Sequence, residues 1–442
     1  MKHPLSRPEG MPVPFRATLL QYLPARVPAA LAEVGAVGLF WVAAIVLASQ
    51  MLQPFTKAYA VAPGSVMLAV IAGYALVALW RGHLGMLAGV ALYLGWLLGE
   101  CVLFSLHAGV RVNVDNALVQ VMVLALVVFR ECRLPLGVVL RIATACCLGY
   151  LAVYVGLNHV LVKLPSAGSA LVLGGAAGRG ARVFLVFEVA FFVLVQGCLR
   201  IWRTPLRGLA MAALAVAAIA LAGSRVLTLA AAGVLPLALV SMWLPGTRRV
   251  FLIAVSVVWL GLVAHGVAGY AVSGLNPYAM MRGDESGRAR YLEFADARAA
   301  MRGHIAFGVG LPPDQVTLNS YTQSVRPFYA SDLGVAGVFF SFGVVGILGF
   351  VGWSLLCLHA MPWPMARRTP AAHALMWTCV FAAAVGWFTP DVIGPSGAAF
   401  VGMLMGVWLK NGVPPRPRVL ALRAEIDPRA RRLRAYAVPP AA

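Results

Sequence analysis

Charged side chains are scarce in this sequence. Asp, Glu, Lys and Arg make up 11% of its 442 residues, whereas 61% are hydrophobic, and the mean hydropathy is +0.85. A soluble domain has to cover its surface with polar groups. This composition therefore excludes an ordinary soluble protein and predicts a polytopic membrane protein.

Acidic residues are the rarer of the charged types, at 15 against 35 Lys and Arg, which gives a net charge of +20. Such a balance is also found in nucleic-acid-binding proteins. Here, however, the cations gather in short segments between apolar runs, and no zinc-finger or RNA-binding motif accompanies them. The pattern therefore predicts membrane topology and no nucleic-acid partner.

Several other chemical signatures are missing. The seven cysteines have no CxxC spacing and the eight histidines are scattered, so we expect no disulfide framework and no metal site. The glycine-rich GGAAGRGAR lacks the GK[ST] of a phosphate-binding loop, and no GxSxG motif occurs. The proline-broken N-terminus does not resemble a signal peptide, so we expect the first membrane helix to direct insertion.

Apolar runs long enough to cross a bilayer recur along the chain, since a membrane helix needs about 20 residues. Twelve are predicted, at 31–52, 63–80, 84–106, 113–129, 134–157, 183–199, 205–223, 226–244, 250–272, 332–357, 373–389 and 395–409. The Lys and Arg bias predicts that both termini are cytoplasmic. The expected parts are a cytoplasmic segment 1–30, helices within 31–272, a periplasmic loop 273–331, helices within 332–409, and a basic cytoplasmic tail 410–442 on anionic lipid.

The long polar loop at 273–331 has content of its own. Its segment SGRARYLEFADARAAMRGH has helix-forming composition, with Tyr291, Phe294, Ala295 and Arg298 near helical spacing. The predicted fold class is therefore an all-α polytopic membrane protein, with about 12 transmembrane helices and one large periplasmic loop between helices 9 and 10 that contains short helices.

Ionisable side chains in or beside membrane helices are costly and are therefore candidates for function. Glu100, Glu188, Arg225 and Asp391 all fall toward the predicted outer leaflet, which suggests a cavity open to that side. Each has a simpler alternative. The two glutamates could hydrogen-bond to neighbouring helices, and Asp391 could be a turn residue. Arg225 favours function, because a turn of almost no length holds it at the bilayer edge beside Ser224.

Arginines are concentrated in the long loop, where their planar forks match phosphate oxygens. They are Arg282, Arg288, Arg290, Arg298, Arg302 and Arg326. The alternative is a solvated helix whose arginines are neutralised by Asp284, Glu293 and Asp296. We favour that alternative for Arg298 and Arg302 but not for Arg290.

Three stretches together resemble the O-antigen ligase and polymerase family of bacterial envelope glycosyltransferases. They are AGSR ending at Arg225, RYLEFADARAAMRGHIAFGVG, and DLGVAGVFFSFGVVG starting at Asp332. The family pattern of Arg, an aromatic and His-x-x-x-Gly-Val-Gly matches Arg290, Phe294, His304 and 308–310. The resemblance covers the twelve-helix layout and is specific over roughly 220–350.

One position indicates the branch of the family. Ligases that attach a finished glycan to the lipid A core have a histidine at the head of the helix after the loop, and Asp332 stands there in this chain. The resemblance is therefore closer to polymerases of O-antigen or exopolysaccharide repeat units.

This resemblance implies a metal-independent glycosyl transfer, without a cofactor, on the periplasmic face of the bacterial inner membrane. An undecaprenyl-diphosphate-linked glycan is the donor, and another lipid-linked unit supplies the acceptor hydroxyl. Arg225 and Arg290 would bind the diphosphate with Arg288 and Arg326 as helpers, and His304 is a cavity candidate. Asp332 would act as the base, or alternatively only cap its helix. Implied partners are membrane lipids, a flippase and a chain-length regulator.

Two alternative functions remain open. The first is a ligase of the same family that transfers polymer to the lipid A core. The second is a transporter of polysaccharide or lipid-linked sugar, for which two related halves and midplane charges are expected. One oversized loop and charges gathered on one side favour glycosyl transfer.

Overall fold

The computed structural model describes residues 27–49, 61–114, 117–161, 172–173, 182–183, 185–244, 247–272, 274–283, 285–313, 315–324, 328–359, 369–386, 393–394 and 397–412. The predicted tail at 410–442 and segment 1–30 lie almost entirely outside these residues, as do the site candidates Arg326 and Asp391.

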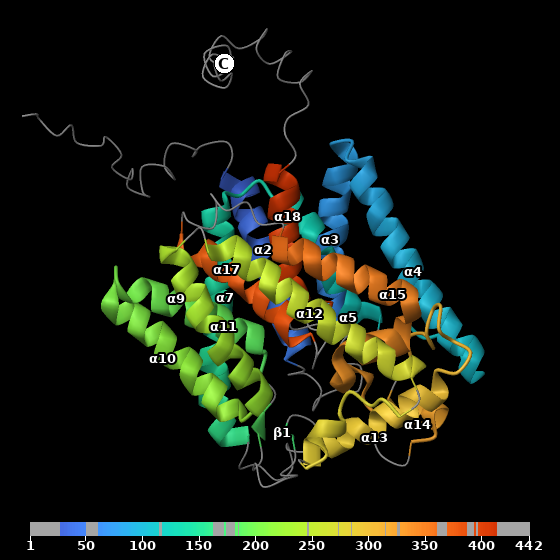
Figure 1. The fold of residues 1–442 in the computed structure, drawn as a ribbon. Coiled ribbons are helices and arrows are strands. Elements are labelled where there is room, and N and C mark those ends of the chain that lie inside the picture. The colour runs from blue at the N-terminus through green and yellow to red at the C-terminus, as the bar shows by residue number, and fades with distance from the viewer. Residues whose placement is uncertain are drawn as a thin grey trace, which may run out of the picture.

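The described chain is helical apart from one two-residue hairpin (Figure 1). Its elements are α2 (Val27–Ala48), α3 (Val61–Trp80), α4 (Leu84–Ala108), α5 (Ala117–Gln120), η1 (Val121–Leu124), α6 (Ala125–Glu131), α7 (Leu136–Leu161), β1 (Val172–Leu173), β2 (Arg182–Val183), α9 (Phe187–Ile201), α10 (Pro205–Ala222), α11 (Arg225–Trp243), α12 (Thr247–Ala271), η3 (Ala279–Met281), α13 (Glu285–Ala300), α14 (Gln315–Thr322), η4 (Ala330–Leu333), α15 (Gly334–His359), α17 (Pro370–Val385) and α18 (Ala398–Gly412).

Eight of the described helices are long and apolar enough to cross a membrane, which is consistent with a polytopic membrane protein. The other four predicted segments contain shorter pieces. The run at 113–129 is divided among α5, η1 and α6, and α9, α17 and α18 have 15, 16 and 15 residues.

The short helices α9 and α17 form the interior of the bundle. Nearly every residue of both is buried, and the rings of Phe191 and Phe381 stack with their centroids 4.5 Å apart. Longer helices around them expose large apolar side chains. Examples are Leu76, Leu92, Leu106, Leu206 and Leu229. An apolar surface of this extent is what a membrane would cover.

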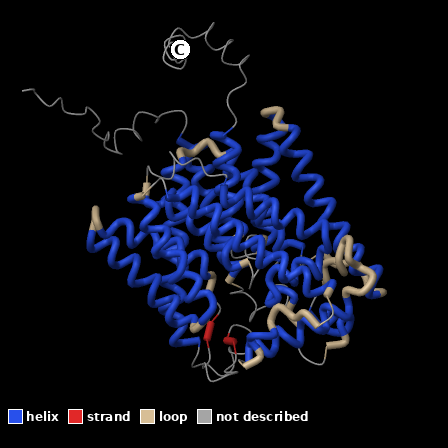
Figure 2. The backbone as a smooth tube through the Cα atoms, viewed as in Figure 1, coloured by secondary structure: helices blue, strands red, loops and turns tan. Residues whose placement is uncertain are grey.

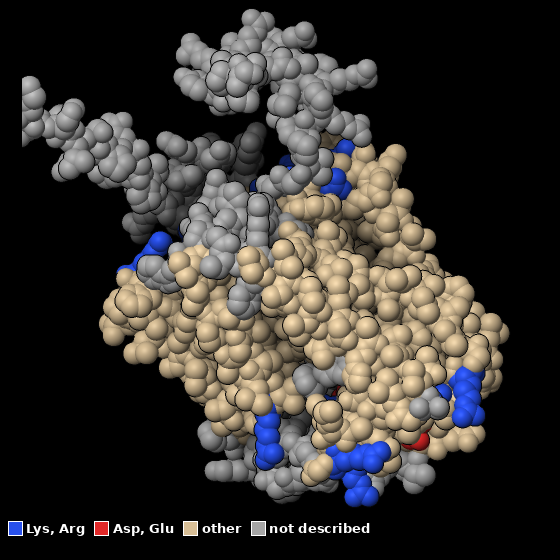
Figure 3. Space-filling view, in the orientation of Figure 1, with Lys and Arg blue, Asp and Glu red and all other residues tan. Residues whose placement is uncertain are grey.

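Polar groups gather at the two ends of the bundle. The α13 end carries α13, α14 and the hairpin of β1 with β2, whereas α18 finishes at the opposite end (Figures 1 and 2). On the face shown in Figure 3, Lys and Arg side chains lie at both ends, and a broad band without them lies between. This distribution is typical of a protein whose middle is in lipid.

The helix predicted within 286–304 is confirmed as α13. Phe294, Ala297 and Met301 are buried, whereas Ala295 is exposed. Of the residues noted near helical spacing, Phe294 therefore lies on the buried face and Ala295 does not.

After α13 the chain enters the bundle as a glycine segment, residues 304–311. The Val309 N–H donates to the Phe340 carbonyl at 2.9 Å, and the Val344 N–H donates to the Ile305 carbonyl at 3.0 Å. These bonds form where α15 is interrupted at Gly343, which has φ 61° and ψ −155°. Irregular backbone is tolerated among membrane helices when protein surrounds it and pairs its polar groups.

Three glycines allow this approach. A Cβ atom at Gly308 would meet the Ser341 carbonyl at 2.4 Å, one at Gly310 would meet the Glu100 carbonyl at 2.4 Å, and one at Gly343 would meet the Ala306 carbonyl at 2.5 Å. Gly349 and Gly352, later in α15, have open space around them and make no such approach.

Candidate functional site

Arg290 and Asp332, which are 42 residues apart in the sequence, meet at the α13 end. The Nε–H of Arg290 on α13 donates to the main-chain carbonyl of Asp332 at 2.9 Å. Asp332 is the third residue of η4, whose turn is closed by the bond from its own N–H to the Tyr329 carbonyl. The structure thus brings together two of the three residues predicted to be catalytic.

Two tyrosines fix the main chain that follows Asp332. The Tyr278 hydroxyl donates to the Leu333 carbonyl at 2.6 Å, and the Tyr270 hydroxyl donates to the Ala336 carbonyl at 2.8 Å. Phe294 lies between both phenol rings, with centroid distances of 4.8 Å to Tyr270 and 6.0 Å to Tyr278. Since all three rings are large and packed, the Asp332 turn has little freedom to move.

The alternative role predicted for Asp332, a cap of the following helix, is not what the geometry shows. Asp332 lies inside η4, and α15 begins only at Gly334, so Leu333 is the residue before it. A carboxylate at this place still lies near the positive end of the helix dipole.

Glu293, predicted from the sequence only to neutralise nearby arginines, is the unexpected member of the site. Its side chain is 8% exposed, and its Oε2 has no hydrogen-bond partner in the described structure. Burial, with the nearby Asp332 carboxylate as the next cause, raises the pKa of Glu293 to about 8, although Arg290 acts in the opposite direction. Arg290 and Glu293 are one helical turn apart, and this spacing was the signal available in the sequence.

His304 is the first residue of the glycine segment, and Glu100 lies beside that segment. The His304 ring packs on His107 of α4 with centroids 4.0 Å apart, and burial followed by His107 lowers the pKa of His304. The main-chain carbonyl of Glu100, also on α4, accepts a bond from Leu311 at 3.0 Å, and its buried Oε2 has no partner among the described residues. The glycine segment is therefore joined to α4 at both of its ends, by His304 and by Leu311.

The remaining predicted residues lie apart from Asp332. Arg225 is the first residue of α11 and is exposed, as is Arg288 on α13. No hydrogen bond or ion pair joins Arg225 to Arg290 or Asp332 in the described part of the chain. Glu188 is fully buried in α9, which packs against α7, α10 and α17, whereas α13 packs against η3, η4, α14 and α15.

A cavity of about 470 Å³ opens beside α14 at the α13 end. Its lining residues are Val110, Arg111, Val112, Asn113, Val114, Pro313 and Thr317. None of the predicted site residues is among them. No group of three His, Cys, Asp or Glu side chains in the described ranges is placed to hold a metal ion.

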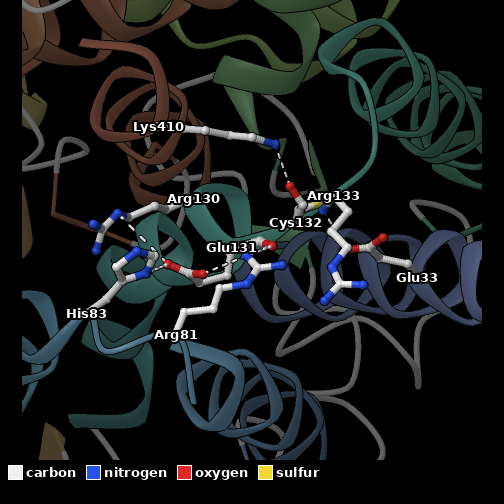
Figure 4. A network of polar contacts seen from close by, with 8 residues as sticks. All are labelled: Glu33, Arg81, His83, Arg130, Glu131, Cys132, Arg133 and Lys410. Atoms are coloured by element: carbon white, nitrogen blue, oxygen red, sulfur yellow. Dashed lines mark hydrogen bonds and ion pairs between the residues drawn. The ribbon is translucent and has the colours of Figure 1, made fainter. Parts of the chain in front are cut away.

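A second charged cluster lies at the opposite end, around the buried carboxylate of Glu131 (Figure 4). Arg81 Nη1 donates to Glu131 Oε2 at 2.8 Å, and His83 Nδ1 lies 2.6 Å from Glu131 Oε1. The Lys410 ammonium on α18 donates to the adjacent Cys132 carbonyl. The cluster thus joins the α3–α4 turn, the end of α6 and α18, which is a structural function.

No protein-family model matches this chain, and no curated protein sequence matches it.

Proposed function

We propose that this chain is a membrane glycosyltransferase that polymerises lipid-linked polysaccharide repeat units. The observation that carries the proposal is the contact of Arg290 with the Asp332 turn, at the polar end of an apolar helical bundle. The resemblance to the O-antigen ligase and polymerase family supplies the substrate class, and aspartate in place of the ligase histidine favours the polymerase branch.

In the proposed reaction, an acceptor sugar hydroxyl attacks the anomeric carbon of a glycan linked to undecaprenyl diphosphate. A new C–O bond forms, the bond to the diphosphate breaks, and its electron pair stays on the leaving diphosphate. The guanidinium of Arg290 stabilises that developing charge, with Arg225 and Arg288 as further phosphate contacts and Arg326 as a fourth. The Asp332 carboxylate takes the proton of the attacking hydroxyl. No metal is needed for either step.

The proposed topology has twelve membrane segments, with both termini in the cytoplasm and the 273–331 loop in the periplasm. The four short or divided segments would cross the bilayer inside the ring of longer helices. Support comes from their burial, because a helix surrounded by protein does not need to match the full bilayer thickness on its own.

Transfer in vitro tests the function directly. Purified full-length protein, given an undecaprenyl-diphosphate oligosaccharide as donor and acceptor, should extend it by whole repeat units. A chelator should leave the rate of transfer unchanged, because in this mechanism the arginines, not a metal ion, stabilise the charge of the leaving diphosphate. Activity that a chelator removes and a metal restores would contradict this mechanism.

Matched variants test the residues. Asp332→Asn keeps size and hydrogen bonding but cannot accept a proton, so we expect transfer to fall about 10²-fold or more. Arg290→Lys keeps the positive charge but loses the planar guanidinium that binds two phosphate oxygens at once, so we expect a comparable fall in the rate of transfer. Arg302→Ala, an exposed position just beyond α13, is the control and should retain the wild-type rate. Wild-type transfer by folded Asp332→Asn would rule out Asp332 as the base.

Deletion of the gene distinguishes the polymerase from the ligase. Loss of a polymerase leaves single repeat units on the lipid carrier or core, whereas loss of a ligase leaves long polymer unattached. Sugar uptake without chain growth, measured in proteoliposomes, would instead favour a transporter.

A further inference from the structure

The Arg290 site holds one more carboxyl group than the proposed mechanism uses. Glu293 is more than nine-tenths buried, lies one turn after Arg290 on α13, and has an oxygen without a hydrogen-bond partner in the described structure. Buried polar groups in folded proteins are nearly always paired, so this one requires an explanation.

The charges around Glu293 come from few elements. Asp332 faces it from η4 and Arg290 from its own helix, and Asp296 follows one turn later, where it accepts a bond from Ser324 at 2.7 Å. Tyr278, just before η3, is also ionisable, and burial raises its pKa. The main chain of Tyr329 hydrogen-bonds to the Glu293 carboxyl group, which acts to lower the pKa of Glu293. From α14 only Tyr321 is ionisable, and its ring packs on Phe104, whereas 334–342 of α15 contain no ionisable side chain.

With both carboxyl groups ionised, two negative charges would share one guanidinium in a buried place. Two carboxylates in one site do not both ionise readily, and the more deeply buried of them keeps its proton. Glu293 is buried, whereas Asp332 is half-buried, so Glu293 is the group that stays neutral.

We propose that Glu293 is a positioning residue that holds the proton of a two-carboxylate site, so that Asp332 is its ionised member and the positive charge of Arg290 is opposed by one carboxylate instead of two. This inference rests on the proposed function, for which it sets the working charge state. The cluster of Arg290, Asp332 and protonated Glu293 is neutral overall, and ionisation of Glu293 would make it negative and repel the anionic donor.

The test is a pH profile of transfer by full-length protein, with KM for the undecaprenyl-diphosphate donor and kcat measured separately. For the wild type we expect KM to rise above about pH 8, by up to about tenfold for each pH unit, because the proton is then lost. Glu293→Gln mimics the protonated form, so its KM should stay low and constant across the range while kcat near neutral pH is retained. Asp296→Asn, the control, should keep the rise in KM, beginning at the wild-type pH or somewhat below it, because Asp296 helps to raise the pKa of Glu293.

Three results would overturn the inference. They are a wild-type KM that is constant from pH 7 to 9.5, a folded Glu293→Gln enzyme that is inactive at every pH, and an Asp296→Asn enzyme with the flat profile. Failure of the proposed function is distinguishable, because wild-type protein would then transfer nothing at any pH. In that case melting temperatures still test the charge state. The melting temperature of the wild type should fall relative to that of Glu293→Gln as the pH rises.

Discussion

A buried carboxyl group that keeps its proton couples the stability of this protein to pH. The pKa of Glu293 is about 8 in the folded protein, against an ordinary value of 4.5. Between these values the folded state binds more protons than the unfolded state, so the free energy of unfolding falls as pH rises.

We therefore expect the melting temperature of the detergent-solubilised wild type to decrease from pH 5 to pH 8 and then to level off. The shift corresponds to about 1.4 kcal/mol for each unit of pKa difference. Glu293→Gln should remove most of this slope. A slope unchanged in the variant would show that another group is responsible.

The sequence indicated part of this candidate site. Arg290 and Asp332 were predicted from motifs that resemble a known family, and the structure places the two residues in contact. Glu293 belongs to no such motif, and its importance depends on how deeply η4 covers α13, which only tertiary structure determines. Arg225 was predicted to share their function because it stands at a tight turn. It lies apart from Arg290 and Asp332, so in the proposed function only the bound substrate would connect it to them.

At the level of elements, the break in α15 depends on Gly343. An alanine there would have to adopt a positive φ, and its Cβ would lie 2.5 Å from the main chain of Ala306. We expect Gly343→Ala to destabilise the protein by more than about 2 kcal/mol and to lower the yield of folded protein.

Gly349 provides the matched control in the same helix. A Cβ there has open space, so Gly349→Ala should leave stability unchanged or raise it by up to about 1 kcal/mol. Equal effects of the two substitutions on the melting temperature would argue against the close approach of the glycine segment.

The Glu131 cluster joins helices at the other end. Because this carboxylate is fully buried and paired with Arg81 and His83, Glu131→Gln should cost about 3 kcal/mol or more of stability. Arg133→Gln is the control, since the Arg133 main-chain N–H, not its side chain, donates to Glu33. Comparable losses of stability in both variants, measured by thermal melting, would mean that the buried ion pairs of Glu131 do not stabilise the fold more than an exposed arginine does.

For the whole molecule, hydropathy predicted the class of fold and most long helices. It also predicted a short last run at 395–409, and α18 has the same length of 15 residues. It did not predict the division of 113–129 into three short pieces. A run of apolar residues predicts a buried segment, but it does not show whether lipid or protein surrounds that segment. The length of a helix inside the bundle depends on its packing against other helices, which composition alone does not determine.

Thiol labelling tests the proposed orientation. Cysteine at exposed Arg302, near α13, should react with an impermeant maleimide in intact cells with a permeabilised outer membrane. Cysteine at exposed Arg203, between α9 and α10, should react only after the inner membrane is opened. Reversed labelling would place the α13 end in the cytoplasm and remove the basis for periplasmic transfer.

The bond from Leu311 to the Glu100 carbonyl also has a consequence for biosynthesis. It joins α4 to a residue 211 positions later, so a ribosome adding roughly 5–20 residues per second needs on the order of 10–40 s to deliver the second partner. Until then the main described neighbours of α4 are α3 and α5, which lie close to it in the sequence. Until residues 304–311 are synthesised, α4 therefore lacks the segment whose main-chain bonds link it to α15.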